Sequence, residues 1–204
     1  MATIKYPFEM IGESVFFNKK DTLKLKEVLQ SDSVKEDDIQ YLINKYPKDV
    51  FLMETLADYL VNKDDFSDAI VLYKYLTTEL KEYLNLYELI ETQLKLIKLL
   101  LIVGDEKEIE SLFKEVEENI KGLNKEVSTS YTTLRLLYMF NKGDTKDIKR
   151  LLHNLEKTDP DMFKHILITI FETQIAPNPQ IPKKEKILFY KKITKGEIDG
   201  LSKS

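Results

Sequence analysis

Side chains that could carry out catalysis are few in this chain, and none of them forms a known catalytic pattern. The chain has no cysteine and only two histidines, His153 and His165. These histidines stand 12 positions apart on what we expect to be different helices, so they make a poor pair of metal ligands. The motifs HExxH, GxxxxGK[ST], GxGxxG and GxSxG are all absent. The sequence therefore favours a non-enzymatic protein with no catalytic residues, no metal and no cofactor.

Carboxylates are abundant, but helix formation accounts for them. The 35 Asp and Glu residues fall at expected helix starts and on expected exposed faces, where capping and solubility favour acids. Against 31 Lys and Arg they leave a net charge of −4. This overall charge gives no general reason to expect binding to nucleic acid.

Composition indicates a folded, soluble, helical protein. Of the 204 residues, 43% are hydrophobic and 32% are charged, and Gly and Pro number six each, which is few for an all-β chain. The most apolar stretch, residues 94–104, is interrupted by Lys95 and Lys98 and is too short to span a membrane. No signal peptide is recognisable, and the lack of cysteine fits an intracellular protein. We therefore predict a cytoplasmic protein without a transmembrane segment.

Three segments, residues 50–80, 91–120 and 130–160, can be aligned with one another. Each has an apolar helical run, a short polar turn and a second helical run. Asp64, Gly104 and Gly143 hold the same place in the turn, where glycine can adopt the positive φ that ends a helix. Apolar residues then follow at shared intervals of five, four and three residues, which places one stripe on each second helix. The stripe residues are Ala69, Tyr73 and Leu76; Ile109, Phe113 and Val116; and Ile148, Leu152 and Leu155.

Polar residues and prolines predict the helix boundaries. Asp105 and Asp144 follow the turn glycines and can accept hydrogen bonds from the N–H groups that open the next helix. Pro47 should end the helix before the first segment, and Asp49 should cap the helix that follows.

A truncated repeat is expected upstream of the first full segment. Ser33 and Glu36 match a capping box, which predicts a helix over residues 34–46. A helical run over residues 22–30 precedes it. Together these two runs resemble an incomplete copy of the same helical pair.

The repeat resembles the tetratricopeptide repeat family over roughly residues 33–160. Leu56, Ala57, Phe66, Ala69 and Tyr73 match the family in order and spacing. The period of 40 and then 39 residues exceeds the family's usual length of about 34, so the set is divergent. The resemblance implies an all-α fold, a right-handed α-solenoid of about three to four helix-turn-helix pairs, which an extra C-terminal helix would complete. A non-repetitive helical bundle is the alternative.

The resemblance also implies a non-catalytic scaffold, adaptor or complex subunit that binds a partner peptide or helix. In this family the first helices of the pairs line a concave groove. The corresponding groove residues here are Glu54, Asp58, Asn62, Leu94, Lys98, Leu101, Thr133, Leu137 and Asn141.

Two of these groove residues bear on the type of partner. Glu54 and Asp58 stand where family members that clamp the C-terminal carboxylates of chaperones carry a basic residue and an Asn. Two acids would repel a carboxylate, so we do not expect a chaperone-tail receptor. The same acids would suit a basic or neutral peptide, and solvated surface charge is the alternative explanation.

The C-terminal segment is separately distinguished by its charge. Three prolines interrupt the chain over residues 175–182, and residues 183–204 then carry seven Lys against three acids. The candidate binding residues of this tail are Lys183, Lys184, Lys186, Phe189, Tyr190, Lys191, Lys192 and Lys195. One interpretation is a last helix that packs on the repeat with its lysines in water. The other is a basic element for RNA, in a ribosome-associated factor for example, or for an anionic lipid surface or an acidic partner.

These observations divide the chain into four parts. We expect an N-terminal arm over residues 1–21, a repeat domain over 22–174, the proline-rich break over 175–182 and the basic helix or tail over 183–204.

Overall fold

The predicted all-α fold class is confirmed. The computed structural model describes residues 18–105, 107–120, 122–143, 145–172, 176–177 and 179–195, and in these ranges it contains helices and no strand. Residues 1–17 of the predicted N-terminal arm lie outside the described ranges. Across the described part of the chain, no helix has the length and apolar character needed to cross a membrane.

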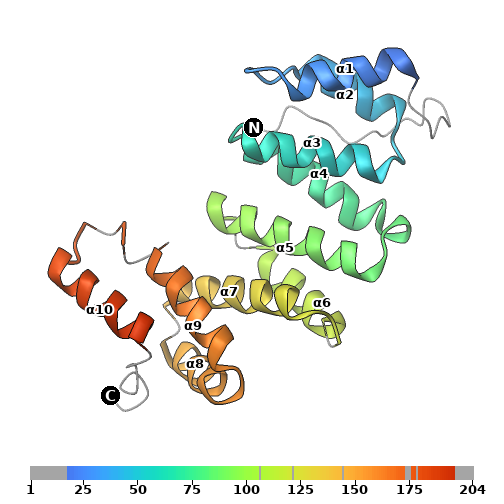
Figure 1. Ribbon diagram of the computed structural model, residues 1–204. Helices are drawn as coiled ribbons and strands as arrows, with labels where there is room; N and C mark the ends of the chain where they lie inside the picture. The colour runs from blue at the N-terminus through green and yellow to red at the C-terminus, as the bar shows by residue number, and fades with distance from the viewer. Residues whose placement is uncertain are drawn as a thin grey trace. The chain divides into compact units, whose positions relative to one another are not determined.

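The contacts between helices divide the chain into two compact units, residues 1–121 and 122–204. The division falls inside the span 22–174 that the sequence assigned to one repeat domain. The first unit contains α1 (Lys19–Leu29), α2 (Glu36–Lys45), α3 (Val50–Asn62), α4 (Phe66–Thr78), the short 3-10 helix η1 (Lys81–Tyr83), α5 (Leu86–Val103) and α6 (Ile109–Asn119). The second contains α7 (Lys125–Lys142), α8 (Thr145–Thr158), α9 (Pro160–Ile170) and α10 (Lys183–Lys195) (Figure 1).

The three predicted helical pairs are present as α3 with α4, α5 with α6, and α7 with α8, and the two helices of each pair contact one another. Their turns share one backbone geometry. Asp64 has a φ of 58°, Gly104 of 76° and Gly143 of 71°, all in the left-handed region. Asp64 is the one described non-glycine residue with a positive φ. Asp tolerates this conformation better than most side chains do, which explains how it substitutes for glycine in the first turn.

The turn geometry gives a simple test. A Cβ at Gly104 would meet no heavy atom within 4 Å, so Gly104→Ala should act only through backbone strain. We expect it to lower the free energy of unfolding by about 1 kcal/mol. Asp64→Gly should have the opposite sign, because it removes a side chain from the same conformation. Urea denaturation followed by circular dichroism measures both, and equal destabilisation by the two variants would contradict the shared turn.

The predicted helix boundaries hold at some positions and fail at others. Asp49 caps α3 as predicted, since its Oδ1 accepts a hydrogen bond from Leu52 N at 2.9 Å. The capping box predicted for Ser33 and Glu36 is wrong. Helix α2 begins at Glu36 itself, after Lys35 as the N-cap, and no side chain caps it.

Asp105, the acid after the turn glycine Gly104, does not cap the next helix as predicted. Asp105 lies four residues before α6 and accepts only a long hydrogen bond from Lys107 N, at 3.4 Å. It is therefore not the N-cap of α6, whose N-cap is Glu108. Asp144 lies outside the described residues.

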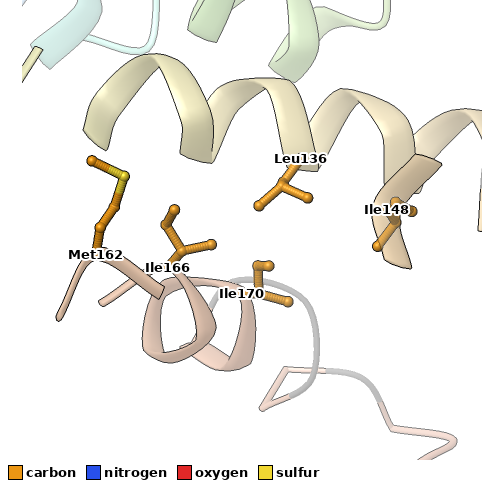
Figure 2. Packing of buried hydrophobic residues seen from close by; sticks show 5 residues of the cluster. All are labelled: Leu136, Ile148, Met162, Ile166 and Ile170. Carbon is orange, nitrogen blue, oxygen red and sulfur yellow. The ribbon is translucent and has the colours of Figure 1, made fainter. Parts of the chain in front are cut away.

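The apolar stripes of the second helices form the core of the first unit. Ala69, Tyr73 and Leu76 of α4 are buried, and so are Ile109, Phe113 and Val116 of α6. In the second unit, Ile148 of α8 is buried, but Leu152 and Leu155 are only half-buried. The core there is completed by α9, which packs against both α7 and α8. Figure 2 shows Leu136, Ile148, Met162, Ile166 and Ile170 of this core.

Candidate functional site

Three of the six predicted groove residues of the first unit lie on one side of α3. On α3, Phe51, Glu54, Asp58 and Asn62 follow one another at intervals of three or four residues, so they share one side of the helix. Phe51 was not among the predicted groove residues, yet 70% of its surface is exposed, more than for any other large hydrophobic residue described. We call these four residues the α3 stripe.

The α3 stripe is joined to α5 by an ion cluster. Lys95 Nζ donates hydrogen bonds to Glu54 Oε1 at 2.9 Å and to both carboxylate oxygens of Asp58 at 3.1 Å. From α4, the hydroxyl of Tyr73 also donates to Asp58. The Lys95 ammonium group lies 5.8 Å from the centre of the Tyr73 ring, within the range of a cation–π contact. Four side chains from three helices therefore form a single polar network.

The protonation states in this cluster are fixed by their surroundings. Burial raises the pKa of Tyr73, and its hydrogen bond to Asp58 raises the pKa further, so the phenol stays protonated. Burial alone would lower the pKa of Lys95, but its hydrogen bonds to Glu54 and Asp58 outweigh this effect and raise the pKa. Lys95 is therefore charged at neutral pH and cancels one of the two neighbouring acids.

This arrangement changes how Glu54 and Asp58 should be interpreted. As a bare pair they would present two negative charges to a partner, whereas with Lys95 the cluster presents about one. Lys95 was not predicted as a site residue. Spacing within one helix could not have found it, because Lys95 lies 41 and 37 residues from its two partners in the sequence.

The other predicted groove residues differ in how accessible they are. Asn62 and Lys98 are exposed and Leu101 is half-buried. Leu94 is only 6% exposed and packs in the core, so it offers almost no surface to a partner. Exposed apolar surface on α5 comes instead from Leu86, Ile102 and Val103, of which Ile102 is 54% exposed and lies four residues beyond Lys98.

Three predicted groove residues lie on α7, in the second unit. Asn141 is exposed, while Thr133 and Leu137 are half-buried. The Thr133 hydroxyl donates to the carbonyl oxygen of Thr129 at 2.8 Å, within its own helix.

A second polar network, which was not predicted from the sequence, joins α1 to α2. The Asp21 side chain has no exposed surface. It accepts hydrogen bonds from Lys45 Nζ at 2.6 Å and from the hydroxyls of Tyr46 at 2.5 Å and Tyr41 at 3.2 Å. Burial would raise the pKa of Asp21, but the hydrogen bonds from Lys45 and Tyr46 outweigh it and lower the pKa. Asp21 is therefore ionised and holds the two helices together.

The basic C-terminal segment forms α10 and packs against α9. The rings of Tyr190 and Phe171 lie 5.1 Å apart between centroids, and Lys186 Nζ donates to the carbonyl oxygen of Ala176 at 2.7 Å. Lys183, Lys184 and Lys191 are exposed. The side chains of Phe189, Lys192 and Lys195 lie outside the described part of the structure.

The described residues include no group of three His, Asp or Glu side chains placed to hold a metal ion. The described features are thus an exposed stripe with an ion cluster, a buried carboxylate network and a basic helix. In comparisons with protein-family models, curated proteins and solved structures, no match to this chain was found.

Proposed function

We propose that this protein is a non-catalytic interaction scaffold or complex subunit, built from tetratricopeptide-like helical pairs that stack as a solenoid. The shared left-handed turns of the three pairs support this reading. So does the place of α3 and α5, the first helices of successive pairs, whose side chains meet at the Lys95 cluster. In this proposal the α3 stripe and the neighbouring surface of α5 receive a segment of another protein.

The observation that carries the proposal is the exposure of Phe51 beside the ion cluster. An aromatic ring left 70% exposed loses favourable free energy that burial would provide. Aromatic residues of this kind are common among the side chains that dominate protein interfaces. The pre-formed hydrogen bonds of Lys95, Glu54 and Asp58 supply a polar surround that needs little reordering on binding.

The charge and apolar surface of the α3 stripe indicate which class of partner it binds. It should be an extended or helical peptide with an apolar side chain to cover Phe51. Because the cluster has a net charge of about −1, the peptide should be neutral or weakly basic, and a strongly acidic peptide should be excluded.

The proposal can be tested before any natural partner is known. Peptides selected from a random library on the intact protein should bind Phe51→Ala about tenfold more weakly or worse. Tyr83→Ala is the matched control, because Tyr83 is also exposed but lies in η1, off the α3 stripe. Isothermal titration calorimetry gives the affinities. Peptides that bind both variants as tightly as the unmodified protein would show that this face is not the binding surface.

A further inference from the structure

We propose that α10 docks the second unit onto the surface of an anionic lipid bilayer. The charge of the chain is divided very unevenly between the two units. Residues 122–204 hold 15 Lys and Arg against 10 Asp and Glu, a net charge of +5. Residues 1–121 hold 16 against 25, a net charge of −9. The second unit is thus the part of the chain that a negatively charged surface attracts.

The exposed side of α10 combines this charge with apolar surface. Lys184, Ile187, Leu188 and Lys191 occupy positions i, i+3, i+4 and i+7, so they form one stripe along the helix. All four are exposed, with 47% of Ile187 and 56% of Leu188 accessible to water. Two adjacent aliphatic side chains therefore lie between two lysines.

The other side of α10 packs against the second unit. The Tyr190 ring packs at a tilt against the ring of Phe171, and Lys186 Nζ donates a hydrogen bond to the carbonyl oxygen of Ala176. These two residues lie four apart, on a side of α10 different from that of the exposed stripe. Because that side of α10 is engaged with α9 and with Ala176, the Lys184–Lys191 stripe lies on the other side of the helix, where all four of its side chains are exposed.

A bilayer suits this stripe better than a nucleic acid does. Ile187 and Leu188 can enter the boundary between headgroups and acyl chains, while the long lysine side chains extend to the lipid phosphates. A single-stranded nucleic acid would be expected to use aromatic rings on which bases stack. Tyr190, whose ring lies in the described part of α10, already packs against Phe171.

The first experiment measures co-sedimentation of the full chain with vesicles. We expect binding to vesicles of phosphatidylcholine and phosphatidylserine in equal parts, binding that weakens with added salt, and little binding to phosphatidylcholine alone. Lys184→Gln with Lys191→Gln should reduce the affinity by about 30-fold, since each lysine near an anionic surface contributes about fivefold. Ile187→Ser with Leu188→Ser should also reduce it.

A matched control removes the same charge elsewhere in the second unit. Lys157 and Lys164 are exposed on α8 and α9, and their replacement by Gln should reduce the affinity several-fold less than replacement of the α10 pair. Circular dichroism checks that every variant is folded. If the control weakened binding as much as the α10 variant, binding would depend on the net charge of the unit and not on α10, and the proposal would be overturned.

A fluorescence experiment distinguishes a lipid from a nucleic acid. The chain contains no tryptophan, so Leu188→Trp introduces a single reporter at an exposed position. Its emission should shift to shorter wavelength when phosphatidylserine vesicles are added. The proposal fails if the emission does not shift, or if single-stranded RNA binds this helix more tightly than the vesicles do.

Discussion

Replacing Phe113 with alanine should lower the free energy of unfolding by about 4 kcal/mol. Phe113 lies at the centre of the apolar stripe of α6 and has no exposed surface. The change removes the contacts of the whole ring and leaves a cavity that neighbouring helices cannot fully close. Chemical denaturation of the full chain provides the measurement.

Phe51→Ala is the control for Phe113→Ala, because it makes the same chemical change at a ring that is 70% exposed. It should change stability by less than about 0.5 kcal/mol. The contrast tests the assignment of the two positions, one to the core of the helical pair and one to its open face. Similar losses at the two positions would show that this assignment is wrong.

Replacing Asp21 with alanine should destabilise the protein by about 2 kcal/mol. The loss comes from removing the hydrogen-bond acceptor of the buried Tyr46 hydroxyl and the counter-ion of Lys45. This loss of stability is smaller than for a deeply buried ion pair, because Lys45 remains one-third exposed and its ammonium group can return to water. Asp38→Ala is the control. Asp38 pairs with Lys24 where both side chains are partly exposed, and such pairs contribute little.

The effect of Asp21 should depend on pH in a defined direction. Its pKa is lowered in the folded protein, so its contribution to stability is fully present above its unfolded pKa of about 4. As the pH falls below that value towards the folded pKa, the contribution is lost. The stability difference between the unmodified protein and Asp21→Ala should therefore be constant near neutral pH and shrink below about pH 4. A difference that grew on acidification would contradict the proposed role of the carboxylate.

Local signals explain which parts of the fold could be predicted from the sequence. The cap at Asp49, the turns at Gly104 and Gly143 and the stripe through Ala69 and Tyr73 are each set by residues close together in the chain. The Ser33 capping box failed because the chain enters α2 two residues later than the motif requires. The core role of α9 was not predicted, because this helix begins at Pro160, where the third aligned segment ends.

The polar networks could not be derived in the same way. Lys95 reaches Glu54 and Asp58 across 41 and 37 residues of sequence, and Asp21 meets Tyr46 across 25. Pairings at such distances depend on how helices pack, which spacing within one helix does not report. Exposure is likewise a property of packing. The spacing of Phe51 places it on the same side of α3 as Glu54 and Asp58, but that 70% of its surface is exposed is known only from the structure.

The order in which helices contact one another bears on how the protein is made. Within each unit, the main contacts join a helix to the next or, for α7 and α9, to the next but one. Closing such short loops costs little chain entropy, and folds of this kind form quickly. A nascent chain can therefore assemble α1 to α4 while the later helices are still being synthesised. In the first unit, α5 and α6 then find their docking surfaces already in place as they emerge, so their apolar stripes spend little time exposed to other molecules.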